Sequence, residues 1–147
     1  MSRANGERGS SAAFVAIMAL PLFLLFGLVL DGGRAIDARL TAKNAAAEAA
    51  RAAASDCDPA ILRQQAGRCV VWPDVAYLRA HEYLQANLPG ALLLSADPGD
   101  VSVSGSQTIT RVTVRVRYRV DTAFLGAVGF RQITVEATQS AYTYVSN

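Results

Sequence analysis

The chain has 147 residues, about the size of one ordinary domain, which leaves little room for two separate cores. Its formal net charge is only +2, whereas nucleic-acid-binding domains concentrate Lys and Arg on a strongly basic face, so we predict no nucleic-acid partner. Hydrophobic residues make up 52% of the chain and are concentrated toward the N-terminus, which indicates that the first third differs in kind from the rest.

The first element is an uncharged apolar run over residues 11–30, which follows a short leader-like tail, residues 1–10. A helix rises about 1.5 Å per residue, so a run of this length spans the roughly 30 Å hydrocarbon core of a bilayer. A charge at the bilayer centre costs about 2.5–3.5 kcal/mol, and none lies between Arg8 and Asp31. We predict a transmembrane helix over residues 11–30 and a cytoplasmic location for the tail.

A cleaved secretory signal is the alternative for the same segment, because Arg3 and Arg8 precede the apolar run. Two details oppose this alternative. The run is longer than the roughly 7–15 apolar residues of a signal peptide, and residues 31–34 contain no Ala-x-Ala cleavage site.

Beyond the membrane, the helix is predicted to continue as an alanine-rich stalk over residues 31–55. The segment from Arg34 to Ala54 contains no Pro or Gly and is rich in alanine, the best helix former. Alanine buries little surface, so we expect this stalk to be stable only if it packs against the C-terminal domain or against neighbouring copies.

The third segment, residues 56–147, is predicted to be a small extracytoplasmic α+β domain. It begins with a short helix over about residues 59–66, bracketed by the chain's two cysteines, Cys57 and Cys69. In an oxidising compartment these thiols are expected to form a disulfide, and two unpaired thiols are the alternative.

A second helix is predicted over about residues 75–88, with a packing face formed by Tyr77, Ala80, His81, Leu84 and Leu88. After the turn at residues 97–100 the hydrophobic period changes from 3.6 to 2, which predicts a sheet. Short connections favour an antiparallel meander of about three strands. The expected strands cover residues 101–104, 109–120 and 132–144.

Two features of this sheet are candidate partner contacts. Arg115, Arg117 and Arg119 alternate with valines, so they share one face, which is either an anion-binding surface or an ordinary solvated face. The connection between the last two strands contains Phe124 and Phe130 and is more hydrophobic than a surface loop requires. A membrane-tethered extracytoplasmic binding module that uses either surface is therefore the alternative function.

Motifs for catalysis or cofactor binding are missing from the sequence. There is no Gly-rich phosphate loop before a helix, no nucleophile elbow and no paired-His metal motif. The single His and the two Cys fall short of the four ligands of a structural zinc site. We predict no enzyme activity, no cofactor, no metal and no small-molecule substrate.

The N-terminal third combines four short patterns: RGSSAA from Arg8 to Ala13, Leu20-Pro21-Leu22, DGGR at residues 31–34 and an alanine-rich stretch from Leu40 to Ala54. This combination resembles the TadE/TadG-like pilus-assembly proteins of tight-adherence (Flp) pilus systems. The resemblance implies a pilin-like fold and a non-enzymatic, minor pilin-like structural or assembly component of a type IV pilus or related secretion system. It also implies other pilin-like or pilus-assembly proteins, or further copies of this chain, as partners.

The same resemblance implies a single pass through the bacterial cell membrane, with the N-terminus inside and the C-terminal domain outside. The cysteine pair also favours an outside location for this domain. Prepilin-peptidase cleavage would map onto the bond between Gly9 and Ser10. Cleaved members carry Glu five residues after the cut, and this sequence has Phe14 there, so a permanent uncleaved anchor stays open as the alternative.

Small residues recur on roughly one face of the apolar run and would permit close packing with other helices. Chance recurrence in an alanine-rich chain is the alternative. The residues of this small-residue track are Ala12, Ala16, Ala19 and Gly27.

Overall fold

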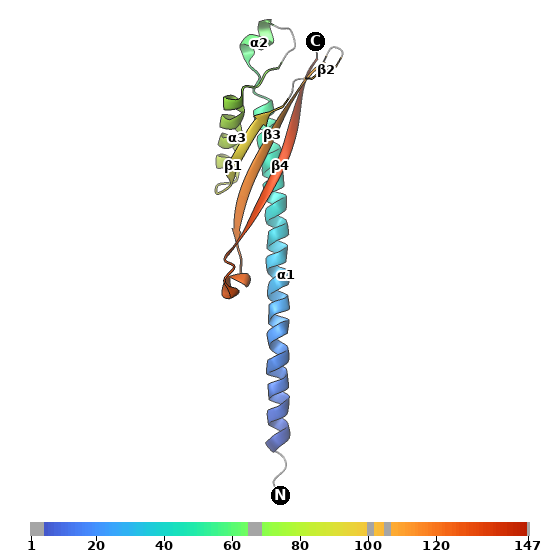
Figure 1. Cartoon of the computed structure of the whole chain (residues 1–147), viewed down its shortest axis with the longest axis vertical. Coiled ribbons are helices and arrows are strands. Elements are labelled where there is room, and N and C mark those ends of the chain that lie inside the picture. Colours follow the sequence, from blue (N-terminus) through green and yellow to red (C-terminus); the bar gives the residue numbers. More distant parts are fainter. Residues whose placement is uncertain (1–4, 65–68, 100–101, 105–106, 147) are drawn as a thin grey trace. The chain divides into compact units, whose positions relative to one another are not determined.

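A computed structural model describes residues 5–64, 69–99, 102–104 and 107–146 (Figure 1). The chain divides into two compact units. The apolar-helix unit contains Met1–Ile36 and Asp121–Ile133, and the sheet unit contains Asp37–Val120 and Thr134–Asn147. Each unit is therefore built from two segments that are far apart in the sequence.

The first element, α1, is a single helix from Asn5 to Ala54 that contributes to both units. This confirms the predicted long N-terminal helix, which continues without a break through Pro21. In the apolar-helix unit its large apolar side chains are exposed, for example Phe23 at 69% and Val29 at 71%. Among the described residues, α1 is the helix that is long and apolar enough to cross a membrane.

In the sheet unit, α1 buries a stripe of alanines that recur three and four residues apart. They pack in one core with Val112, Val114 and Val116, which the structure buries completely. Small side chains on the helix let its backbone approach the sheet closely. This half of the helix is therefore packed against the chain's own C-terminal domain, which is one of the two arrangements expected from the sequence. The alanine stripe consists of Ala42, Ala46, Ala49, Ala50 and Ala53.

Two shorter helices follow, α2 at Pro59–Gln64 and α3 at Pro73–Asn87. The end predicted for the first of these, residue 66, lies outside the described residues. The packing face of α3 consists of Ala76, Ala80 and Leu84, at steps of four residues. Of the predicted packing face, Ala80 and Leu84 are therefore confirmed. Tyr77 and His81 are not part of it, because both are exposed and stack on each other with ring centroids 6.2 Å apart.

Among the described residues, the sheet has four strands: β1 at Leu92–Pro98, β2 at Ser102–Ser104, β3 at Gln107–Asp121 and β4 at Gln132–Ser146 (Figure 1). The predicted α+β class and antiparallel pairing are confirmed, and β1 is an additional strand that the sequence analysis did not predict. β1 pairs antiparallel with β3, and β2 pairs with the start of the same strand. β4 also pairs with β3.

β1 was missed because a bulge breaks its alternation. The pairing with β3 shifts register between Leu93 and Ser95, so the buried residues of β1 are Leu93 and Ala96, three positions apart. An extra residue in one strand resets which side chains face the core. The local pattern LLLSA therefore lacks the period of 2 by which a half-buried strand is recognised.

Two hydrogen bonds join distant segments inside the sheet unit. The Thr110 hydroxyl donates to the Cys69 carbonyl at 2.8 Å, and the Thr143 hydroxyl on β4 donates to the Ala54 carbonyl at 2.7 Å. The second bond satisfies one of the carbonyls that every helix leaves without an intrahelical partner at its C-terminal end. The last strand thus holds the end of α1 within this unit.

Candidate partner-contact surfaces

Asp31 organises the apolar-helix unit. Its side chain is fully buried, and its carboxylate accepts hydrogen bonds from the backbone N–H groups of Ala123, Phe124 and Leu125 at 2.7, 2.9 and 2.6 Å. We call this set of three hydrogen bonds the Asp31 clamp. Burying a carboxylate is costly unless it is hydrogen-bonded, and these donors supply the compensation.

The donors of the clamp stand at the start of a short 3₁₀ helix, η1 at Leu125–Val128. The first N–H groups of a helix have no partner within it and carry partial positive charge, so an anionic side chain there is stabilising. No side chain of the loop itself caps η1, and Asp31 from α1 takes that position.

Phe124 packs directly over Gly27 of α1. A Cβ added at Gly27 would lie 2.6 Å from the Cβ of Phe124, so no side chain larger than hydrogen fits there. The Phe124 ring also meets Phe26 edge to face, with centroids 6.4 Å apart. Together with neighbouring residues these contacts leave an apolar groove of about 200 Å³. The groove is lined by Leu20, Phe23, Leu24, Gly27, Leu28, Phe124 and Leu125.

The segment from Thr122 to Phe130, which we call the apolar loop, is closed by its own hydrogen bonds. The Phe130 N–H donates to the Leu125 carbonyl at 2.9 Å, and the Thr122 N–H donates to the Arg131 carbonyl at 3.0 Å. Gly129 has a φ of +100°, a left-handed conformation that favours glycine, where the chain turns out of η1. Phe130 itself is 69% exposed.

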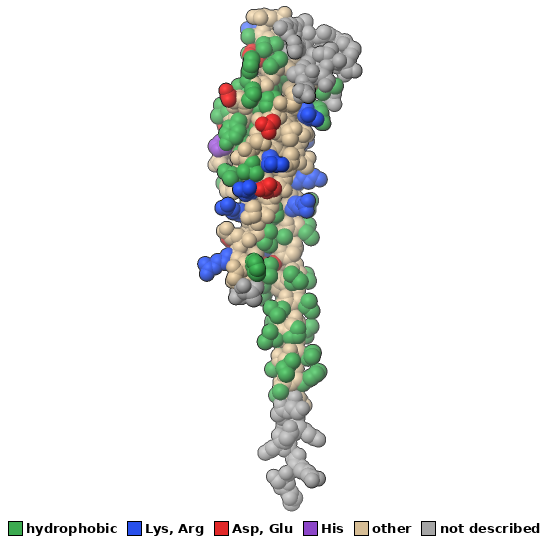
Figure 2. Space-filling model, in the orientation of Figure 1, with side chains coloured by type: hydrophobic (Ala, Val, Ile, Leu, Met, Phe, Trp, Pro, Cys, Tyr) green, Lys and Arg blue, Asp and Glu red, His purple; other side chains and the backbone are tan. Residues whose placement is uncertain are grey.

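The arginine face of β3 is only partly free. Arg117 forms an ion pair with Glu136 of β4, with N–O distances of 2.9 and 2.7 Å. Within the described part of the chain, Arg115 and Arg119 are exposed and form no ion pair. Figure 2 shows Lys and Arg side chains interspersed with Asp and Glu side chains, and hydrophobic side chains along the first half of α1.

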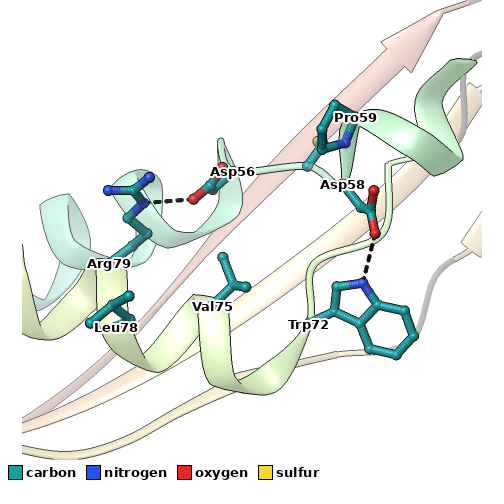
Figure 3. Close-up of a pocket in the computed structure, with 8 residues that line it drawn as sticks. Asp56, Asp58, Pro59, Trp72, Val75, Leu78 and Arg79 are labelled. Carbon is teal, nitrogen blue, oxygen red and sulfur yellow. Dashed lines mark hydrogen bonds and ion pairs between the residues drawn. The ribbon is translucent and has the colours of Figure 1, made fainter.

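A second pocket, of about 400 Å³, lies beside the disulfide in the sheet unit (Figure 3). Cys57 and Cys69 are bonded, with Cα atoms 5.1 Å apart, which confirms the predicted disulfide. At the pocket, the Trp72 indole N–H donates to Asp58 at 3.0 Å, and Arg79 pairs with Asp56 at 2.6 Å (Figure 3).

The polar groups of this pocket form hydrogen bonds and ion pairs with other groups of the protein. The hydrogen bond from Trp72, followed by that from the Ala60 N–H, holds the pKa of the Asp58 carboxyl below its ordinary value. The ion pairs with Asp56 and Glu82 raise the pKa of the Arg79 guanidinium. These interactions fix the disulfide-bonded connection onto α3, which is a structural role.

The remaining candidate residues lie on α1. Ala12 and Ala16 are exposed and Ala19 is partly buried, whereas Gly27 is buried by Phe124. Gly27 therefore differs from the other members of the small-residue track, because the chain's own loop already occupies its surface. Gly9 and Ser10 lie within the first turns of α1. No cluster of His, Cys, Asp or Glu suited to a metal ion occurs among the described residues.

Sequence reasoning missed the partnership of Asp31 and Gly27 with the apolar loop. The signals were present separately, as an Asp directly after the apolar run and a hydrophobic loop with Phe124 at its start. Nothing in a single sequence connects groups 92–94 positions apart.

Comparison with known proteins gives one match. Residues 9–56 match the family described as putative Flp pilus-assembly TadE/G-like, which is about a third of the chain and contains both Gly27 and Asp31. No curated protein and no solved structure matches the chain. Over residues 9–56 the chain is therefore similar to the TadE/TadG-like Flp pilus-assembly proteins.

Proposed function

We propose that this protein is a membrane-anchored, minor pilin-like structural or assembly component of a tight-adherence (Flp) pilus or a related secretion system. One observation carries the proposal: the exposed apolar half of α1 lies within the segment that matches the pilus-assembly family. The protein would act through helix packing and surface contacts and would catalyse no reaction.

The exposed apolar surface of α1 supports an anchor. Large side chains from Phe14 to Leu30 are between 42% and 71% exposed. Soluble monomers rarely expose contiguous apolar patches of more than a few hundred Å². Lipid, or the apolar helices of other pilin-like subunits, would cover this surface.

The disulfide supports an extracytoplasmic location for the sheet unit. Structural disulfides persist in oxidising compartments and are rare in the cytosol. With the bond between Cys57 and Cys69 outside, a single pass by α1 would leave the N-terminus inside the cell.

Contacts with other pilin-like helices would use the exposed part of the small-residue track, Ala12 and Ala16, because small side chains permit close approach of helices in a membrane. Cleavage between Gly9 and Ser10 by a prepilin peptidase would release the subunit for filament entry. Retention of that bond would make the protein a permanent anchor, the form that Phe14 in place of Glu favours.

The test combines mass and cross-linking in the native cell. A photo-reactive residue at Ala16 should cross-link to pilus-system components, whereas the same residue at Thr138, exposed on β4, provides the matched control in the sheet unit. Intact mass would separate a chain beginning at Ser10 from an uncleaved one. If position 16 captures no pilus-system protein and deletion of the gene leaves pili intact, the proposal fails.

A membrane-tethered binding module is the second candidate, favoured by the exposure of Arg115 and Arg119 without acidic partners among the described residues. Replacing Arg115, Arg117 and Arg119 by Ala would then abolish binding of an anionic ligand and leave pilus assembly unchanged. A loss of pili with no loss of ligand binding would reject this candidate.

A further inference from the structure

The apolar loop lies beside a part of α1 that the proposed function places within the bilayer. Phe124 and Leu125 share a groove with α1 residues from Leu20 to Leu28. At about 1.5 Å per residue, those positions lie roughly 3–15 Å inside the end of the apolar run at Leu30. Side chains that contact this stretch of α1 must therefore be at the depth of the hydrocarbon when α1 crosses the membrane.

The composition of the loop suits that depth. No charged residue occurs from Thr122 to Phe130, and Asp121 and Arg131 flank the segment. Phe130 is 69% exposed, which is unfavourable in water for a large aromatic ring. Arg131 and Arg34, both exposed in the same unit, are suited to contact lipid phosphates at the membrane surface.

The hydrogen bonding of the loop also suits an environment without water. Irregular backbone is costly in hydrocarbon because each N–H group without a partner costs several kcal/mol. Here the Asp31 clamp satisfies the three N–H groups at the start of η1. Internal bonds satisfy the N–H groups of Thr122, Gly129 and Phe130.

We propose that the apolar loop is a second membrane contact, which inserts Phe124, Leu125 and Phe130 into the outer leaflet of the bilayer beside α1. This inference rests on the proposed membrane anchor. Lipid acyl chains are the occupant because the exposed surface of the loop continues the exposed apolar surface of α1 in one unit. The Asp31 clamp holds the loop at that depth.

The experiment uses full-length protein in vesicles of phosphatidylethanolamine and phosphatidylglycerol, with or without bromine on the acyl chains. Trp72 is the only tryptophan, so Trp72→Phe provides a background without emission from tryptophan. Phe130→Trp in this background reports on the loop and Phe23→Trp reports on the anchor. Tyr142→Trp, on an exposed residue of β4, is the aqueous control.

We expect brominated lipid to reduce the emission of the Phe130→Trp variant to an extent approaching that of Phe23→Trp, and to leave Tyr142→Trp unchanged. Adding Asp31→Asn should reduce quenching at position 130 and preserve quenching at position 23. Quenching at position 23 alone would overturn the loop insertion and leave the anchor standing. Absence of quenching at both positions would overturn the anchor as well. Quenching at position 130 that stays unchanged in the Asp31→Asn variant would overturn the role of the clamp.

Discussion

The helix α1 exposes polar residues in one unit of this protein and apolar residues in the other. In the sheet unit, α1 buries alanines against valines and exposes polar residues. In the apolar-helix unit, the same helix exposes leucines and phenylalanines, and its buried groups are Asp31 and Gly27. The difference indicates that burial from water stabilises one unit, whereas hydrogen bonds and close packing of a loop organise the other.

The largest expected effect compares the same substitution in both units. Leu84→Ala removes a side chain that is 1% exposed and should lower the free energy of unfolding of the sheet unit by about 2–5 kcal/mol. Leu25→Ala, on a residue that is 59% exposed, should leave that free energy nearly unchanged. Thermal or denaturant unfolding in detergent micelles measures both. Equal losses for the two variants would contradict the contrast between the units.

Breaking the Asp31 clamp should loosen the apolar loop selectively. Asp31→Ala leaves three partly buried backbone N–H groups without their acceptor, and the cost of a fully buried unsatisfied donor, about 1–3 kcal/mol, is the upper limit for each. Amide hydrogen exchange should therefore accelerate at residues 123–125 and stay unchanged in β3. Asp37→Ala, on an exposed carboxylate of the same helix, is the control. Unchanged exchange at the loop would show that the clamp does not hold it.

Two glycines of α1 should respond to alanine with opposite signs. Gly27→Ala places a methyl group against Phe124, and overpacking of this kind costs about 1–3 kcal/mol. Gly33→Ala meets no atom within 4 Å and should stabilise the helix by roughly 0.5–1 kcal/mol. The melting temperature in micelles distinguishes them, and a stabilised Gly27→Ala variant would reject the close contact with Phe124.

The smallest expected effect is a pH dependence at Asp58. Its pKa is lowered in the folded protein, so its contribution to stability is present above the unfolded value of about 3.9 and is lost as pH falls through the folded pKa. The melting temperature, followed by Trp72 fluorescence, should fall in that acidic range, and it should fall less in the Asp58→Asn variant. An identical acid dependence in both proteins would exclude Asp58 as its source.

Elements whose residues show a regular local pattern could be predicted from the sequence. The alternation of Val112, Val114 and Val116 with polar residues predicted β3, and the uncharged run before Asp31 predicted the apolar half of α1. The bulge in β1 hid a strand, because it removed that alternation. In α3, the predicted packing face correctly included Ala80 and Leu84, but it also included the exposed Tyr77 and His81 and omitted the buried Ala76.

The candidate surfaces were predictable only in part. The sequence predicted an arginine face on the central strand and a hydrophobic loop after it, and the structure exposes Arg115, Arg119 and Phe130. The roles of Asp31 and Gly27 were not accessible, because each depends on a loop that the chain adds about ninety positions later. Long-range pairing of this kind leaves no periodic signal in either partner.

The long separation between Asp31 and its donors has a consequence for biogenesis. During synthesis Asp31 is made 92 positions before Ala123, so its carboxylate lacks these three donors for most of translation. If α1 spans a membrane as proposed, the clamp can close only after β3 has been made and delivered to the same side of that membrane as Asp31. It is therefore a late folding event, and a chain truncated or stalled before residue 123 would retain a free carboxylate at the end of its apolar run.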